Sequence, residues 1–210
     1  MLSIIVIILG IRLAIIVLHM FSEMISNKFT PLKTQDYKLD LGDLTCLCLN
    51  MITETCFTVW LYNYNIIVLS TFFPLNVLCL LVCDDLLYAP YHHALHHKNV
   101  YHWIHFRHHK ISHPSKSYIH ASMEHPLEMM GALLMHAFLI TILHPVLDKV
   151  SILVHISIKA LGACLNHSGR DVQCTLYKTR CHHLHHMYGM CNFSQYVFIY
   201  DLLIGTYKTC

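Results

Sequence analysis

Long apolar stretches are the feature that most constrains how this chain can fold. Hydrophobic residues make up 55% of its 210 residues, charged residues only 12%, and the mean hydropathy is +0.48. A soluble domain of this size carries roughly 25% charged residues. Several of the stretches approach the length of about 20 apolar residues that a membrane helix needs. The sequence therefore predicts an all-α, polytopic membrane protein with two or more transmembrane helical hairpins.

The apolar stretches divide into an N-terminal segment and two pairs. The run Leu2–Phe21 is interrupted only by Arg12. No polar segment with a small-residue cleavage site follows it, so we favour a retained membrane anchor over a cleaved signal peptide. The two predicted hairpins are formed by residues 45–61 with 66–83, and by residues 127–143 with 150–165.

Basic residues predict which side of the membrane the polar segments face. Two hairpins with short turns place residues 21–44, 84–126 and 166–210 on the same side, and these segments hold eleven of the 14 Lys and Arg residues. Because short cytoplasmic segments are enriched in Lys and Arg, we expect all three in the cytosol. We divide the chain into an anchor with a polar loop (1–44) and a membrane domain with a cytosolic helical cap (45–210).

Cysteine spacing and net charge exclude several classes of function. None of the ten cysteines forms a CxxC pair, so we expect mostly reduced thiols rather than a disulfide framework or a zinc ribbon. The formal net charge is +2 and the chain has no long basic run, which argues against nucleic acid as a partner.

Histidine is the second unusual feature of the composition. The chain has 20 histidines, and eleven of them fall between His92 and His125. An HxxHH pattern occurs twice, and an HxxxH pair precedes the first copy. Because positions i, i+3 and i+4 share one helix face, we expect each HxxHH copy to aim three imidazoles at one point. The candidate ligands are His92, His96, His105, His108, His109, His182, His185 and His186.

Eight imidazoles exceed what one four- to six-coordinate ion can use, so the pattern predicts two metal ions. The first pair is ambiguous, because His93 and His97 have the same spacing as His92 and His96. The other histidines lack a repeated spacing, and we expect them to be solvated, packed or hydrogen-bonded side chains. They are His19, His102, His113, His120, His125, His136, His144, His155 and His183.

With these three patterns, the chain resembles the sterol desaturase/fatty acid hydroxylase superfamily, whose HxxxH, HxxHH and HxxHH motifs occur in the same order. The resemblance runs from about Asp84 to Tyr207 and includes further motifs. These are Glu124-His125-Pro126-Leu127-Glu128, Asn166-His167-Ser168-Gly169, and Asn192 with Asp201 and Gly205-Thr206.

The resemblance implies a ligand set and a reaction. It selects His92 with His96, keeps His97 in reserve, and adds His167 as a ninth ligand. It also implies an endoplasmic reticulum enzyme with two iron ions that uses dioxygen to hydroxylate or desaturate a sterol or fatty acid. Electrons would come from NAD(P)H through a reductase and cytochrome b5 or a similar carrier, since the chain has no Rossmann or flavin motif.

Some features leave alternatives open. The family usually has Arg at the position of His93 and Asp at that of His183, which would suit a catalytically inactive lipid- or metal-binding relative. A His-rich metal transporter is the third hypothesis, although its ligands would lie along the membrane helices. Nitrogen ligands alone favour zinc over ferrous iron, so iron rests on the resemblance. Asp85 and Asp201 are candidates to accept ring N–H groups from ligating histidines, and a solvated or helix-end carboxylate is the equally weighted alternative for each.

Overall fold

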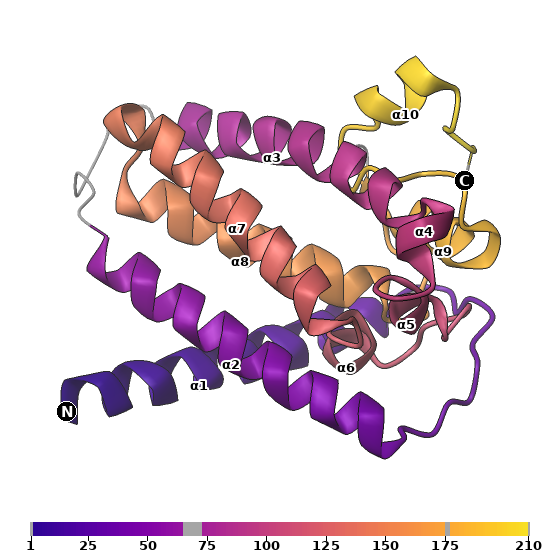
Figure 1. Ribbon diagram of the computed structural model, residues 1–210, viewed down its shortest axis with the longest axis horizontal. Coiled ribbons are helices and arrows are strands. Elements are labelled where there is room, and N and C mark those ends of the chain that lie inside the picture. Colours follow the sequence, from indigo (N-terminus) through magenta and orange to yellow (C-terminus); the bar gives the residue numbers. More distant parts are fainter. Residues whose placement is uncertain (1, 65–72, 175–176, 210) are drawn as a thin grey trace.

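The computed structural model describes residues 2–64, 73–174 and 177–209, and it is mainly helical (Figure 1). A single antiparallel pair of two-residue strands is found in this part of the chain. The elements are α1 (Leu2–Ser26), α2 (Leu41–Asn63), α3 (Phe73–Leu95), α4 (Lys98–Tyr101), α5 (Phe106–His109), α6 (Ser117–Ala121), α7 (Pro126–Leu143), a 3-10 turn (His144–Val146), α8 (Lys149–Asn166), β1 (Gln173–Cys174), β2 (Tyr177–Lys178), α9 (Thr179–Tyr188) and α10 (Ile199–Ile204).

Among the described residues, four helices are long and apolar enough to cross a membrane: α2, α3, α7 and α8. This confirms the prediction of an all-α polytopic membrane protein. The part of α1 whose side chains are described, Leu13–Ser26, is apolar but shorter, and α1 packs against α8. The membrane anchor at the N-terminus stays a prediction.

Three helix boundaries differ by four residues or more from those predicted. Helix α1 continues past Phe21 to Ser26. Helix α2 begins at Leu41 because Asp40 caps it, accepting the backbone N–H of Asp43 at 2.7 Å in a reciprocal capping box. Helix α3 runs to Leu95 rather than ending at residue 83. The predicted helix ended at residue 83 because the polar residues Asp84 and Asp85 interrupt the apolar pattern. In the folded chain both carboxylates have partners, and the helix continues through them. The predicted start at residue 66 lies outside the described residues.

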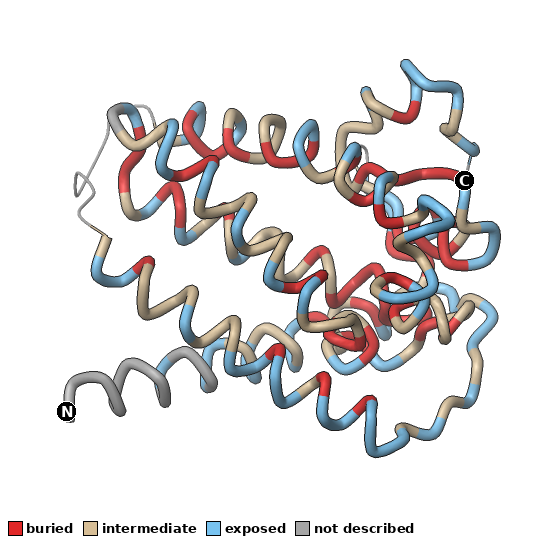
Figure 2. The backbone as a smooth tube through the Cα atoms, viewed as in Figure 1, coloured by how far each residue is buried: buried red, intermediate tan, exposed pale blue. Residues whose placement is uncertain are grey.

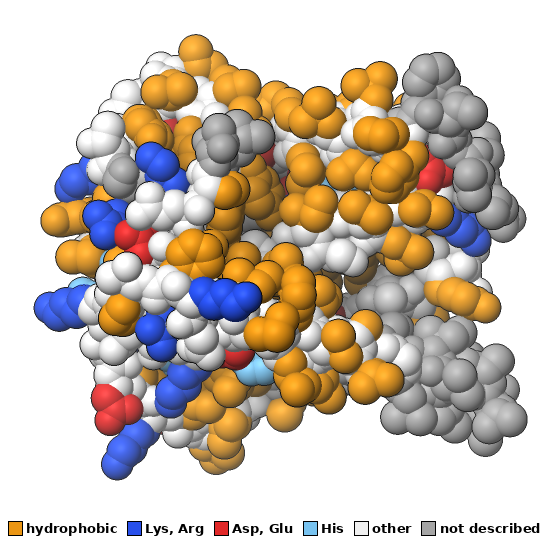
Figure 3. All heavy atoms as spheres, turned by 180° about the vertical axis from the view of Figure 1, so that it is seen from behind, with side chains coloured by type: hydrophobic (Ala, Val, Ile, Leu, Met, Phe, Trp, Pro, Cys, Tyr) orange, Lys and Arg blue, Asp and Glu red, His pale blue; other side chains and the backbone are white. Residues whose placement is uncertain are grey.

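The short helices α4, α5, α6, α9 and α10 gather at one end of the bundle and form a cap (Figure 1). Buried residues are concentrated in this cap and on the inner faces of the long helices (Figure 2). On the face shown in Figure 3, most Lys and Arg side chains lie at the cap end, whereas hydrophobic side chains cover the helices. A buried apolar core joins the long helices through Leu61, Leu80, Leu139, Ile140, Leu147 and Ile152.

The polar segment between α1 and α2 packs against the cap. Leu32 donates its backbone N–H to Gly169, and Gln35 donates to His113, at 2.9 and 3.0 Å. At the start of α2, the buried carboxylate of Asp43 accepts from Arg107 of α5 at 2.7 Å. These contacts tie the first part of the chain to the elements that carry the histidines.

Candidate metal centre

All nine predicted ligands lie at the cap end of the bundle, in two groups. Within each group, one ring nitrogen from every residue lies within 4.8 Å of those of all the others. The five-histidine cluster consists of His92, His96, His105, His109 and His185. The four-histidine cluster consists of His108, His167, His182 and His186.

Each HxxHH motif divides its imidazoles between the two clusters, so the expectation that three rings of one motif aim at one point was wrong. In the second motif, for example, His182 and His186 join the four-histidine cluster and His185 joins the other. At 3.6 residues per turn, residues i and i+4 differ by only about 40° around a helix, whereas i+3 and i+4 differ by about 100°. The i, i+4 pair therefore converges, and the i+3 ring points to the neighbouring cluster.

The Nε2 atoms of the clustered histidines face one another at short range. In the four-histidine cluster, the His167 Nε2 atom lies 3.1 Å from that of His186, 3.2 Å from that of His182 and 3.4 Å from that of His108. In the five-histidine cluster, the His185 Nε2 atom lies 3.1 Å from that of His109 and 3.3 Å from that of His96. The Nε2 atoms of His92 and His105 are 3.2 Å apart.

In five of these rings, the hydrogen-bond partner of the other ring nitrogen, Nδ1, determines the tautomer. Each of these Nδ1 atoms lies 2.7 to 3.0 Å from a carbonyl or carboxylate oxygen, which only accepts hydrogen bonds, so Nδ1 carries the hydrogen and Nε2 bears a lone pair. The pairs are His92 with Phe193 O, His105 with Glu128 Oε1, His167 with Ala163 O, His185 with Cys191 O, and His186 with Ile111 O.

Lone pairs that face each other at this distance fit a metal ion. His167 and His186 both donate from Nδ1, so their Nε2 atoms, 3.1 Å apart, have no hydrogen to share. A cation between them replaces repulsion by coordination. Imidazole donors lie about 2.1 Å from a metal, so neighbouring donors are about 3.0 Å apart at a right angle and about 3.4 Å apart at a tetrahedral angle. The Nε2 distances of both clusters match this range.

Burial keeps the imidazoles neutral, as ligands must be. It lowers the pKa of His109 to about 3 and that of His167 to about 4. Burial, together with the neighbouring imidazoles, holds the pKa of His182 and His185 well below the ordinary histidine value. At neutral pH the rings therefore present lone pairs without first losing a proton.

Of the two alternative first pairs, the structure places His92 and His96 in a cluster. His93 turns away from both clusters: its Nδ1 lies 2.7 Å from the Tyr200 hydroxyl, and its ring stacks on Phe193 at 4.3 Å. His97 is exposed and caps α4. His96 thus faces inward with His92, and it also lines an open cavity of about 520 Å³ together with Pro90, His93, Ala94, His97, Lys98, Met190 and Tyr200.

The two aspartates considered as acceptors for ring N–H groups bind backbone N–H groups instead. Asp85 accepts the backbone N–H groups of Gln195, Tyr196 and Val197 at 2.7 to 3.2 Å. Asp201 accepts the backbone N–H groups of residues 193 and 194, both at 2.8 Å. Both carboxylates hold the chain that follows α9, and they act on the clusters only through it. Backbone N–H groups of a loop that have no other partner satisfy a buried carboxylate as well as a ring N–H group would.

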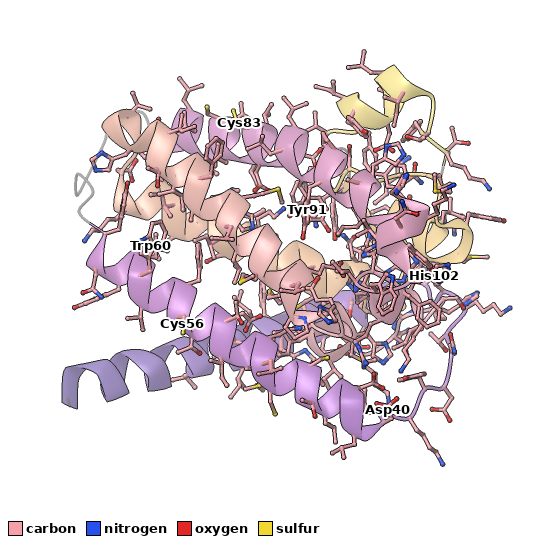
Figure 4. The ribbon with its side chains drawn as sticks, in the orientation of Figure 1. Asp40, Cys56, Trp60, Cys83, Tyr91 and His102 are labelled. Carbon is pink, nitrogen blue, oxygen red and sulfur yellow. The ribbon has the colours of Figure 1, made fainter. Side chains whose placement is uncertain are left out.

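Glu128 is the functional residue whose role sequence reasoning missed. Its carboxylate accepts the Nδ1–H of His105 at 2.7 Å, and its side chain is only 4% exposed. Tyr91, which points between α3 and α7 (Figure 4), donates its hydroxyl to the Glu128 carbonyl at 3.0 Å. Glu128 belongs to the motif that begins at Glu124, but its spacing from His105 carries no signal. The carbonyl partners of the other rings leave no trace in the sequence at all.

The remaining histidines lie outside the two clusters. His120 accepts the backbone N–H of Ser115, and His125 caps α7. His183 is buried edge-on against His113 with ring centroids 5.2 Å apart. His102 is exposed in the cap (Figure 4). His136 and His155 lie between the membrane helices, within 4.8 Å of Asp84.

The helical bundle and its two histidine clusters define an integral membrane protein whose side chains could hold metal ions. The family model described as fatty acid hydroxylase matches residues 77–206, more than half of the chain. The chain therefore belongs to the fatty acid hydroxylase family, within the sterol desaturase/fatty acid hydroxylase superfamily named by the sequence motifs. This family implies an oxidoreductase that acts on a membrane lipid. No curated protein and no solved structure shows significant similarity to the chain.

Proposed function

We propose that the protein is a membrane-bound di-iron oxidase that hydroxylates or desaturates a lipid, either a sterol or a fatty acid. The observation that carries the proposal is the convergence of nine imidazoles in two clusters, with the Nδ1 atoms of five rings committed to oxygen acceptors. One ion in each cluster would use five and four of these donors. Nitrogen ligands also suit zinc, and iron is chosen because the family's oxidation chemistry requires a redox-active metal.

The iron pair, when bound, would supply the reduction of dioxygen that C–H oxidation needs. The protein's own contribution is to hold neutral ligands in place. The carbonyls of Phe193, Cys191, Ala163 and Ile111 fix four rings by accepting their Nδ1–H groups. The carboxylate of Glu128 does the same for His105 and makes that ring a stronger donor. The open cavity beside His96 supports an approach to the five-histidine cluster from outside the cap.

Electrons would reach this site from a separate carrier. The sequence has no Rossmann or flavin motif, and so we propose cytochrome b5 or a similar protein, reduced by its NAD(P)H reductase. Lys and Arg side chains at the cap end provide a basic surface that an acidic carrier would recognise (Figure 3). The same basic residues support a cap that faces the cytosol, and the family's lipid chemistry supports a location in the endoplasmic reticulum.

The test compares His185→Ala with His102→Ala in protein purified from membranes without chelator. His185 lies between His96 and His109 in the five-histidine cluster, whereas His102 is an exposed cap residue outside both clusters. Metal analysis should find two ions per chain in wild type and His102→Ala, and fewer in His185→Ala. Supplied with iron, dioxygen, NAD(P)H, reductase and cytochrome b5, the first two should oxidise membrane lipid and His185→Ala should not.

Two results would contradict the proposal. Full metal content without lipid oxidation, under all donor conditions, would indicate a catalytically inactive relative. Metal uptake into sealed vesicles that depends on His185, again without lipid oxidation, would indicate a transporter.

A further inference from the structure

A charged network lies between the membrane helices, outside both histidine clusters. Asp84 of α3 is buried and Lys159 of α8 is partly buried, and the Lys159 Nζ atom lies 2.5 Å from Asp84 Oδ2. The other oxygen of Asp84 lies 2.7 Å from the His136 Nδ1 atom. Charged side chains are costly inside a bilayer and are usually kept there for a function.

A metal ion does not explain this network well. Asp84, His136 and His155 each offer a donor atom within 4.8 Å of the other two, which is a possible metal-binding geometry. The ammonium group of Lys159, however, already supplies the cation at Asp84 and would repel a second one.

The network extends from the membrane helices to the chain that follows α9. Lys159 donates to the Gln195 side-chain oxygen at 2.5 Å, and its ammonium group lies over the ring of Tyr196 at 5.3 Å. The neighbouring carboxylate, Asp85, accepts the backbone N–H groups of residues 195, 196 and 197. The charges of α3 and α8 thus hold one short segment, residues 195–197, from the membrane side.

That segment continues directly from the carbonyls that orient one cluster. Phe193 O accepts from His92, and Cys191 O accepts from His185, both in the five-histidine cluster. The carbonyls that orient the four-histidine cluster belong to Ala163, within α8, and to Ile111, in the cap. Displacement of residues 191–197 would therefore misalign rings of one cluster and spare the other.

We infer that Asp84, Asp85 and Lys159 are positioning residues for the five-histidine cluster, acting through the segment 191–197. The inference rests on the proposed function for the presence of a metal in each cluster. The network anchors this segment to the membrane helices, and Asp201 accepts two further backbone N–H groups from it, those of residues 193 and 194. Loss of the membrane-side anchor should weaken only the metal in the five-histidine cluster.

The experiment measures each cluster alone, with zinc as the probe. A His182→Ala background disables the four-histidine cluster, and a His96→Ala background disables the five-histidine cluster. Lys159→Met is introduced into both, and affinity is measured by competition with a chromogenic chelator. Zinc binding should weaken about 10–100-fold in the His182→Ala background, the usual effect of losing outer support, and about threefold or less in the His96→Ala background.

Three further variants separate positioning from general damage to the fold. Gln195→Met leaves the Asp84–Lys159 pair intact but removes the acceptor in the segment, and it should weaken the same site. Lys159→Arg should restore binding, because a guanidinium can still reach both Asp84 and Gln195. Lys149→Met makes the same change at the start of α8, far from the segment, and should have no effect.

Equal weakening of both sites, or of neither, would overturn the inference. Absence of zinc from the wild-type protein would overturn it together with the metal assignment. Site-specific weakening in a protein that never oxidises lipid would support the positioning role and overturn only the proposed function.

Discussion

Removal of the Glu128 carboxylate tests the assignment of the outer partners most directly. In Glu128→Ala, the His105 Nδ1–H loses its acceptor at 2.7 Å. The His105 side chain is 0% exposed, so water does not replace that acceptor without rearrangement. Leaving a buried donor unsatisfied costs about 1–3 kcal/mol. Since about 1.4 kcal/mol corresponds to a tenfold change in affinity, a metal that needs this ring orientation should bind roughly 10–100-fold more weakly.

The measurement is zinc affinity by chelator competition in detergent, followed by lipid oxidation with the reconstituted electron donors. Glu128→Gln retains a side-chain carbonyl that can accept from His105, and its affinity should fall less than that of Glu128→Ala. Glu54→Ala is the matched control, because Glu54 accepts from the Tyr118 hydroxyl at 2.9 Å and belongs to neither histidine cluster. If Glu128→Ala bound zinc as tightly as wild type at both clusters, the argument from the Nδ1 partners would be refuted.

The adjacent residues His96 and His97 form a natural matched pair: His96→Ala should remove metal from the five-histidine cluster, and His97→Ala should leave both metals in place, as elemental analysis would show. Metal loss in His97→Ala alone would reverse the assignment of the first motif. A glycosylation acceptor inserted beside Lys116, which is exposed in the cap, should stay unmodified in cells if the cap faces the cytosol. A glycan at that site, detected as a mass shift that a glycosidase removes, would show that the cap faces the lumen and would contradict the predicted topology.

The local pattern of the sequence was enough to identify the membrane helices and eight of the nine clustered histidines. Apolar runs predict membrane helices directly, because each residue in a bilayer must suit the surrounding lipid, whatever contacts it makes with distant parts of the chain. Histidine spacing along one helix is also a local property. His167 was the exception: it has no partner at helical spacing, and only the family resemblance drew attention to it.

Only the tertiary structure decided how those residues are used. The division of each HxxHH motif depends on where α5, α8 and α9 meet, which no spacing within a motif records. Helix α3 continues through Asp84 and Asp85 because α8 and the chain after α9 supply partners for both carboxylates. The acceptors of the ring N–H groups are mostly backbone carbonyls, which every residue type carries. Side-chain identity therefore cannot reveal them, and they emerge only when the chain is folded.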